Sequence, residues 1–314
     1  MKKFPPLELG DIKTYSLNER SSKVSVEEFA KPWSSGGSLS SFFDCLPRLL
    51  AASDFNQVVD LLARAVRNKK TVILAMGGHP VKVGLAPIII ELIERGILSL
   101  LAVNGSVMVH DSEVALVGAT SEDVAASIRG GTFGMARETA ELIHRAAFDA
   151  VQNNLGLGRA LGLRLEEGKY PYTKKSVFAA AARLDVPVTV HVALGTDIVH
   201  IHPQADGANL GQASLSDFRL FCEAVATLEG GVFINLGSAV ILPEVFLKAV
   251  SLARNLGHSL ENLTTVNMDF IRQYRPQVNV VERPTAAGGQ GFNLTGHHEL
   301  MFPLLAAALI EKLG

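Results

Sequence analysis

The sequence predicts an α/β fold with a mainly parallel sheet that is covered by helices on both faces. Several short segments are apolar at every position, as strands buried on both faces are, and amphipathic segments of helical length separate them. The chain has 314 residues, of which 48% are hydrophobic and 19% are charged. This composition is enough for a large core and for a buried contact with a second subunit.

Residues 1–41 are predicted to form an N-terminal arm, because this stretch is rich in proline, serine and glycine and has little periodicity. Apolar residues then repeat at helical spacing over residues 39–68, which predicts helical structure there. No clear linker follows the arm. Residues 42–314 are therefore interpreted as a single α/β domain.

Strands and helices are predicted to alternate from residue 71 onward, each strand from its apolar run and each helix from its apolar stripe. The predicted strands, in chain order, are 71–76, 97–103, 187–194, 231–235, 263–268 and 278–281. The predicted helices are 81–95, 135–151, 174–184, 215–228, 243–256 and 299–313. Two glycine-rich stretches are interpreted as irregular: 153–168, and 288–291, which has the character of a flexible lid.

The composition excludes several classes of function. Lys and Arg total 29 against 31 for Asp and Glu, so no basic field is available for a nucleic-acid backbone. No apolar run approaches the roughly 18 residues of a membrane helix, and none follows the first residues as in a secretory signal. The two cysteines, Cys45 and Cys222, are too few for a disulfide framework and fit a reducing cytoplasm. A small-molecule substrate is the expected partner.

Three of the predicted strands end in glycine-rich turns, and helices are predicted to follow the first and the last. The turns are Gly77-Gly78, Asn104-Gly105-Ser106 and Gly237-Ser238. Glycine lets the backbone approach a ligand closely, and a helix N-terminus offers free N–H groups to an anion such as a pyrophosphate. A nucleotide site and ordinary turn chemistry both explain these turns. No G-x-G-x-x-G sequence follows a predicted strand, so the standard dinucleotide fingerprint is absent.

One carboxylate and two imidazoles follow the predicted strand 187–194: Asp197, His200 and His202. Open α/β sheets place their chemistry at this end of a strand. If the segment is extended, the two histidines point the same way and can chelate a metal. If it is the first turn of a helix, Asp197 is the N-cap and shares a face with His200, while His202 turns away. Acid/base catalysis, metal binding and structural hydrogen bonding all remain open for this segment.

Three longer blocks of sequence carry a further signal. Residues 71–111 run from a strand through a glycine break and a helix to a second strand and N-G-S-V-M-V-H-D. Residues 186–236 contain V-P-V-T-V-H, G-T-D-I-V-H-I-H and G-V-F-I-N-L-G, and residues 298–308 read H-E-L-M-F-P-L-L-A-A-A. In their order along the chain and their residue pattern, these blocks resemble the deoxyhypusine synthase family. The resemblance implies a Rossmann-like core that binds NAD, with sites shared between the subunits of a tetramer.

The resemblance also implies roles for individual residues. The positions that match the family's NAD-contacting turns, or its glycine run over the cofactor, are Gly78, His79, Asn104, Gly105, Ser106, Gly237 and Ser238. Asp197 matches an acidic residue that faces the amine substrate of the family. These assignments depend on the resemblance and not on the spacing of the residues.

The resemblance fails where the family's chemistry is concentrated. The family's amine transfer needs a lysine in a W-G-K motif, and the corresponding residues 283–296 contain neither lysine nor tryptophan. Histidine cannot replace a lysine that forms an imine, because that step needs a primary amine. His297 also stands where the family has an aspartate. The chain is therefore predicted to be a divergent relative and not an active deoxyhypusine synthase.

Three functions are compatible with these observations. The leading hypothesis is an NAD- or nucleotide-binding transferase or oxidoreductase that acts on a small polar or amine substrate. In it, His200 or His202 acts as acid/base, and Asp197 orients the substrate or the imidazole. The second is a metal-dependent hydrolase or lyase that uses His200, His202 and one of Asp197, His297 or His298. The third is a non-catalytic binding protein that kept the scaffold.

Overall fold

The computed structural model of the chain describes residues 4–314, and it divides into two compact units, one ending at Ser53 and the other spanning Asp54–Gly314. The N-terminal unit contains three short helical segments, η1 (Leu17–Glu19), η2 (Val26–Glu28) and α1 (Leu39–Asp44). Within it, Trp33 packs edge-on against Phe42, with ring centroids 5.6 Å apart. The first three residues of the predicted arm lie outside the described residues.

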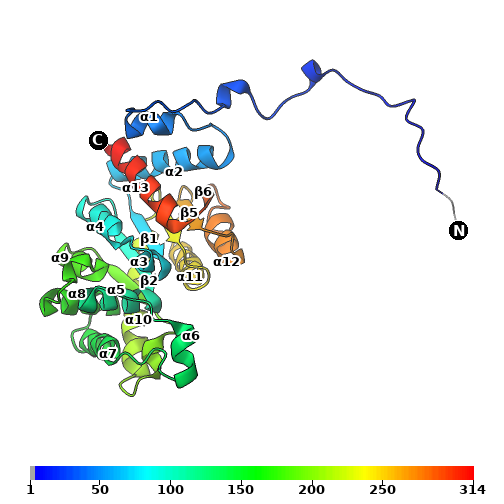
Figure 1. Cartoon of the computed structure of the whole chain (residues 1–314). Coiled ribbons are helices and arrows are strands. Elements are labelled where there is room, and N and C mark those ends of the chain that lie inside the picture. The colour runs from blue at the N-terminus through cyan, green and yellow to red at the C-terminus, as the bar shows by residue number, and fades with distance from the viewer. Residues whose placement is uncertain (1–3) are drawn as a thin grey trace. The chain divides into compact units, whose positions relative to one another are not determined.

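The larger unit is built on one six-stranded sheet in the order β3-β2-β1-β4-β5-β6, and every pair of neighbours is parallel (Figure 1). The strands are β1 (Val72–Met76), β2 (Leu100–Asn104), β3 (Val188–His191), β4 (Val232–Leu236), β5 (Thr264–Asp269) and β6 (Gln290–Thr295). All but β6 are buried along almost their whole length, as their apolar runs predicted. The predicted α/β class with a parallel sheet is confirmed.

Helices cover both faces of this sheet. They are α2 (Leu50–Arg67), α3 (His79–Lys82), α4 (Ala86–Glu94), α5 (Gly105–Val117), α6 (Val124–Ser127), α7 (Arg137–Gln152), α8 (Leu157–Gly168), α9 (Val177–Arg183), α10 (Gly207–Ala226), α11 (Ile241–Asn255), α12 (Tyr274–Pro276) and α13 (His298–Leu313). Shorter 3-10 or π segments are η3 (Ile128–Gly130), η4 (Thr173–Lys175), η5 (Ile198–Ile201) and η6 (Gln277–Glu282). Ile73 and Phe233 share a core cluster with side chains of α10 and α11, whereas Leu74 and Ile234 lie among side chains of α2, α4 and α13. Alternate strand residues therefore face two separate helical layers.

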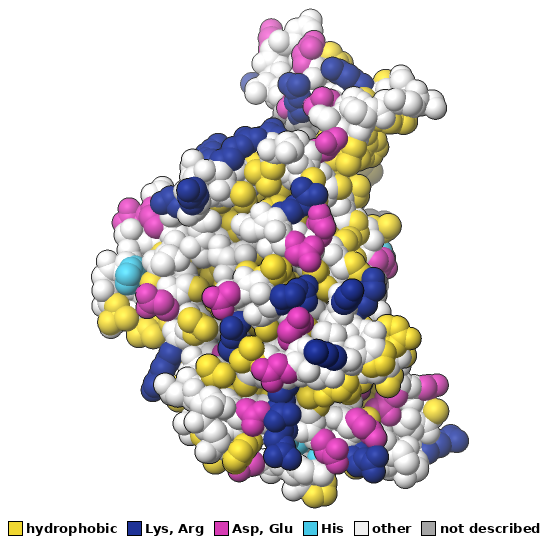
Figure 2. Space-filling view, turned by 90° about the vertical axis from the view of Figure 1, so that its left-hand side faces the viewer, with side chains coloured by type: hydrophobic (Ala, Val, Ile, Leu, Met, Phe, Trp, Pro, Cys, Tyr) yellow, Lys and Arg dark blue, Asp and Glu magenta, His cyan; other side chains and the backbone are white. Residues whose placement is uncertain are grey.

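The surface agrees with the balanced charge of the chain. On the face of the molecule drawn in Figure 2, basic and acidic side chains are interspersed, without an extended area of one sign. Among residues 4–314, no helix combines the length and the hydropathy that a membrane span requires.

Three of the predicted elements are wrong. The stretch 153–168, predicted to be irregular, contains α8, and its glycines permit close packing: a Cβ at Gly158 would lie 1.9 Å from the carbonyl oxygen of Val188. Residues 278–281, predicted as a strand, belong to the π-helical segment η6. The last strand is instead β6, which begins inside the predicted loop 288–291. β6 is a partly exposed edge strand without an apolar run, whereas the other edge strand, β3, is buried.

Helix boundaries near the sheet edge also differ from the prediction. The predicted helix 81–95 is split into α3 and α4 around Gly84, which has a φ of +80°. The helix α5 begins at Gly105 directly after β2, where only a glycine turn was predicted. Its start therefore lies at the carboxyl edge of the sheet, beside the predicted site residues.

Candidate functional site

The carboxyl ends of the strands lie at one edge of the sheet, and the strand order reverses between β1 and β4. In open α/β sheets a ligand binds in the crevice at this switch point. Gly77 follows β1 and Gly237 follows β4, and a Cβ at Gly77 would lie 2.7 Å from the Gly237 carbonyl oxygen. Gly237 has a φ of +67°, and its N–H donates to the Met268 carbonyl oxygen at 2.9 Å. The turns after β1 and β4 and the end of β5 are thus in close backbone contact.

The glycine turns after β1 and β2 also touch each other. A Cβ at Gly78 would lie 2.1 Å from Ser106 Oγ. Asn104 caps α5, since its Oδ1 accepts the N–H of Val107 at 3.3 Å. The Ser238 hydroxyl similarly accepts the N–H of the residue four positions later, at 3.1 Å. The Asn104 and Ser238 side chains therefore stabilise helix starts, and a ligand at these turns would meet chiefly backbone groups and Ser106.

The Asp197 side chain packs against the first residue of α5. Asp197 itself is the N-cap residue of η5, in the loop that follows β3. A Cβ at Gly105 would lie 1.9 Å from Asp197 Oδ2, so only glycine at the first position of α5 lets the carboxylate come this close. The dipole of the helix favours a negative charge at its N-terminus. Of the two conformations weighed for this segment, the helical one is observed.

Asp197 and His200 form a buried pair. Their Oδ2 and Nε2 atoms are 4.0 Å apart, the side chains are 10% and 7% exposed, and neither atom has a hydrogen-bond partner among the described residues. His200 Nδ1 accepts the N–H groups of Gly195 at 3.1 Å and of Asp197 at 3.2 Å, so the proton of the neutral ring lies on Nε2. Burial raises the pKa of the Asp197 carboxyl to about 6 and lowers the pKa of the His200 imidazole. The pair thus presents one acceptor and one N–H donor near neutral pH.

His202 has a different partner. Its Nε2 is 2.8 Å from the carbonyl oxygen of Gly134, which belongs to the segment between α5 and α7. Glu122 accepts the N–H of the same glycine at 2.7 Å. Gly134 has a φ of +76°, and a Cβ there would lie 2.7 Å from the side chain of Ile198. His202 therefore holds the segment 118–136 against the loop that carries Asp197.

A cavity of about 180 Å³ lies beside Asp197. One wall is the face of α5 that carries Ser106, His110 and Glu113, which are spaced by three or four residues and so lie above one another. The remaining charged side chains of the lining are Lys82, from the end of α3, and Glu122. The cavity therefore combines one ammonium group, three carboxyl groups and one imidazole.

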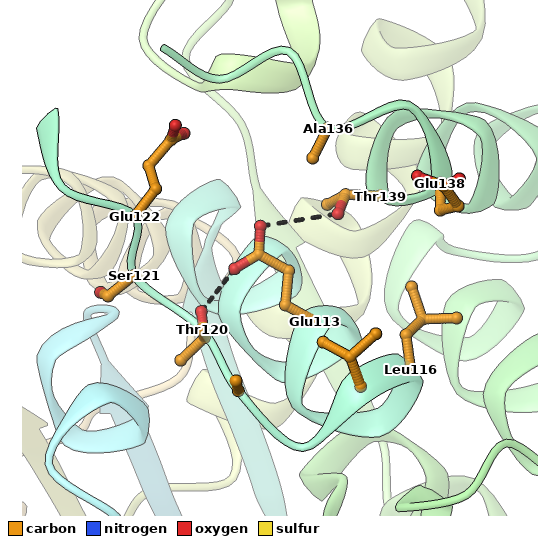
Figure 3. Close-up of a pocket in the computed structure, with 10 residues that line it drawn as sticks. Glu113, Leu116, Thr120, Ser121, Glu122, Ala136, Glu138 and Thr139 are labelled. Atoms are coloured by element: carbon orange, nitrogen blue, oxygen red, sulfur yellow. Dashed lines mark hydrogen bonds between the residues drawn. The ribbon is translucent and has the colours of Figure 1, made fainter. Parts of the chain in front are cut away.

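Glu113 lines both this cavity and a second one of about 640 Å³ (Figure 3). Its two carboxylate oxygens accept hydrogen bonds from Thr120 at 2.5 Å and from Thr139 at 3.5 Å. His110 Nδ1 lies 2.7 Å from the same Thr120 hydroxyl. Burial by itself would raise the pKa of Glu113, but its interactions with His110 and Thr120 lower the pKa below the ordinary value. Glu113 is therefore an ionised carboxylate held between the two cavities.

A second Asp–His pair lies at the end of β5. His298, the first residue of α13, has its Nε2 3.7 Å from Asp269 Oδ1, and these side chains are 1% and 4% exposed. A Cβ at Gly237 would lie 2.5 Å from the His298 ring. The ring of His79, an exposed residue, packs edge-on against His298 with centroids 5.2 Å apart. His297 is also exposed. This pair is sealed by packing at the switch point.

The side chains suggested as metal ligands do not come together. His202 and His298 have separate partners, Gly134 and Asp269, while His200 faces Asp197. Within residues 4–314, no group of three or more His, Cys, Asp or Glu side chains is arranged to hold a metal ion. The metal-dependent alternative therefore has no ligand set in the described part of the chain.

Sequence reasoning missed four charged or titratable side chains of the smaller cavity: Lys82, His110, Glu113 and Glu122. The spacing of His110 and Glu113 would have placed them on one helix face, but the helix α5 was not predicted. Nothing in the sequence connects Lys82 with Asp197, which lies more than a hundred positions later.

The sequence matches no protein-family model and no curated protein. Solved structures do match. AgrE, in a ternary complex with ornithine and NAD+, aligns with a TM-score of 0.57 and 14% identity over 83% of this chain and 33% of the AgrE chain. A LOR/SDH candidate from Methanococcus maripaludis S2 gives 0.54 and 14% identity over 93% of this chain and 75% of its own. A deoxyhypusine synthase candidate from Entamoeba histolytica gives 0.50 and 13% identity over 96% of this chain and 97% of its own.

At these identities the likeness concerns the fold alone. This chain spans a third of the AgrE chain, at 33%, but the match to the Entamoeba histolytica protein runs through nearly the whole of both chains. Together with the six-stranded parallel sheet, this confirms the predicted resemblance at the level of architecture. The chain has the Rossmann-like α/β fold of the deoxyhypusine synthase-like proteins.

Proposed function

We propose that this protein is an enzyme that binds NAD or a similar nucleotide at the β1–β4 switch point and acts on a small amine substrate in the neighbouring cavity. One observation carries the proposal. The Asp197–His200 pair keeps a buried carboxylate oxygen and a buried ring nitrogen without partners, and Asp197 lines a cavity next to the glycine turns. Buried polar atoms without partners are costly in a stable fold, so their retention favours a ligand-binding role.

The backbone at the switch point suits a dinucleotide. Gly77, Gly78 and Gly237 let the turns after β1 and β4 pack closely there, and ligands bind at this point in open α/β sheets. The residues that would hold it are Gly78, His79, Ser106 and Gly237, together with the backbone of Asn104 and Ser238. The Cβ positions of Gly78, Gly105 and Gly237 are taken by Ser106, Asp197 and His298, so these glycines would meet the cofactor through backbone atoms alone. When bound, NAD supplies a hydride acceptor.

The residues of the chain supply the proton chemistry. Asp197 is a carboxylate whose pKa of about 6 lies close to neutral pH, which suits a group that accepts a proton and returns it. His200 is held in one orientation by two backbone N–H groups, and its Nε2 proton lies on the side of Asp197 Oδ2, 4.0 Å away. We assign Asp197 as the acid/base and His200 as the group that orients the substrate. His202 is a positioning residue for the segment around Gly134.

An amine is favoured as the substrate because Asp197, Glu113 and Glu122 all border the smaller cavity. AgrE, which shares the fold, has been solved with ornithine and NAD+ together, which supports this combination of ligands. Amine transfer through a lysine imine is not proposed, since residues 283–296 contain no lysine. We also propose a cytoplasmic homotetramer, from the apolar composition and the family resemblance.

Calorimetry with NAD+ and NADH tests the cofactor. We expect saturable binding to the wild type at sub-millimolar Kd, and a loss of about ten-fold or more in Gly78→Val, whose side chain would enter the Ser106 position. Gly211→Ala is the matched control, because a Cβ at Gly211 meets no atom within 4 Å. Absence of binding at millimolar cofactor in a folded protein would overturn the cofactor assignment.

Titration with two amines, L-ornithine and 1,4-diaminobutane, tests the substrate site. Binding of either one should fall by about ten-fold or more in Asp197→Asn. Asp185→Asn, which changes a side chain that is 89% exposed, should bind like the wild type. If neither amine binds, or if binding does not depend on Asp197, the amine assignment is wrong.

A further inference from the structure

The smaller cavity is lined by charged side chains of both signs. Lys82 lines it from the end of α3, and Asp197, Glu113 and Glu122 line it from three other parts of the chain. No carboxylate among residues 4–314 lies within 4.0 Å of the Lys82 ammonium group, although three of them border the same cavity. The lining therefore carries the ammonium group of Lys82, an exposed residue, unpaired with any of the three carboxylates.

Asp197 is the free acceptor among the three carboxylates. Glu113 already accepts hydrogen bonds from Thr120 and Thr139, and Glu122 accepts one from the N–H of Gly134. Asp197 Oδ2 has no partner, and its side chain is nine-tenths buried at 10% exposure. An ammonium group placed beside Asp197 would pair with this oxygen, since a buried charge needs a partner of opposite sign.

Lys82 is the group that distinguishes between ligand classes. A ligand that carries only ammonium groups would leave Lys82 facing a like charge in the cavity. A ligand that carries only a carboxylate would face Asp197, Glu113 and Glu122. A ligand with both groups can pair with both signs of charge, and the apolar side chains Val109 and Phe133 in the lining suit the short carbon chain between them.

We propose that this cavity binds a small zwitterion of the amino-acid class, with its carboxylate toward Lys82 and an ammonium group beside Asp197. This inference rests on the proposed function, in which Asp197 handles the substrate's proton. It adds the class of substrate and makes Lys82 the residue that selects it.

Calorimetry with three probes tests the inference on the full chain. L-ornithine and 1,4-diaminobutane share their carbon chain and differ by the carboxylate, and pentanoate has the carboxylate without an amine. We expect L-ornithine to bind at least about ten-fold more tightly than 1,4-diaminobutane, and pentanoate not to bind measurably. Equal or tighter binding of the diamine would overturn the proposal.

The variant Lys82→Met keeps an unbranched side chain, one atom shorter, and removes its charge. It should weaken L-ornithine by about ten-fold and leave 1,4-diaminobutane unchanged or tighter. Lys174→Met, at an exposed lysine of η4, is the control and should change neither. Binding of L-ornithine that is insensitive to Lys82 would overturn the proposal.

The same titrations separate this inference from the proposed function. If both amines bind through Asp197 but Lys82→Met has no effect, the zwitterion assignment fails and the amine site stands. If L-ornithine binds through Lys82 but NAD does not bind, the cofactor assignment fails and the zwitterion site stands. If no probe binds to folded protein at about 10 mM, both assignments for this cavity are wrong.

Discussion

Two Asp–His pairs lie at the same edge of the sheet in the described part of the chain, and Asp197 of the first pair borders a cavity. Asp197–His200 and Asp269–His298 have similar separations, 4.0 Å and 3.7 Å, and each packs on a glycine that has no room for a Cβ. Asp197 nevertheless lines a cavity, whereas His298 is 1% exposed and is packed against His79. The residue types do not by themselves make a site, because the space beside them decides what they can bind.

The glycines offer the largest test of this difference. Gly237→Ala would force a side chain into a left-handed backbone conformation and against the buried His298 ring, so we expect a loss of about 3 kcal/mol in the free energy of unfolding. Gly105→Ala would push Asp197 toward the cavity, where it has room, and should cost only about 1 kcal/mol. Urea unfolding of both variants checks this. Equal losses would show that the two pairs are packed alike.

The pH dependence of stability is the next test. Since burial raises the pKa of Asp197 to about 6, its contribution to stability is fully present below the unfolded-state pKa of about 4 and is lost as the pH rises through 6. Asp197→Asn imitates the protonated form. It should match the wild type near pH 4 and be more stable by about 1–3 kcal/mol near pH 8. Asp185→Asn, at an exposed carboxylate, should show no such crossover.

The two ring nitrogens of His200 can be tested separately, Nδ1 as an acceptor and Nε2 as a donor. His200→Asn keeps an acceptor near the position of Nδ1, for the N–H groups of Gly195 and Asp197, but removes the Nε2 donor. We expect it to unfold within about 1 kcal/mol of the wild type while losing L-ornithine binding, whereas His200→Ala should cost about 1–2 kcal/mol. Wild-type binding by the Asn variant would remove His200 from the site.

The smallest effect is expected at His202. His202→Ala removes one hydrogen bond to the Gly134 carbonyl and should cost about 0.5–1.5 kcal/mol. Amide exchange should accelerate in the segment 118–136 and stay unchanged around His298, because only the first region depends on this bond. A loss of L-ornithine binding as complete as that of Asp197→Asn would instead place His202 in the site.

Much of the fold could be predicted because the signal is local. The strands β1 to β5 are buried along almost their whole length, and in β1, β2 and β4 a mainly apolar run reports that directly. The strand β6 was not predicted because it is partly exposed and has no apolar run. The helix α8 was not predicted because its glycines serve close packing on β3 and not chain flexibility. The helix α5 was not predicted because it begins inside a turn motif, with Gly105 as its first residue.

The candidate site could be predicted only in part. The segment of Asp197, His200 and His202 was identified from its place after a strand, and the glycine turns from their place after β1, β2 and β4. The sequence did not decide whether His202 acts together with Asp197 and His200, since the extended and helical alternatives give His202 opposite roles. The structure separates His202 from the pair and adds Glu113, a residue that no motif marked.

The sequence by itself determined the parallel α/β class, the edge of the sheet where chemistry belongs, and the absence of a lysine from residues 283–296. Those properties follow from residue type and from spacing along the chain. Only the tertiary structure decided that Asp197 packs against the start of α5 and that Lys82 and Asp197 line the same cavity. It also decided that the His298 side chain is buried. These depend on which distant segments pack together and on the volume left between them, which local patterns do not encode.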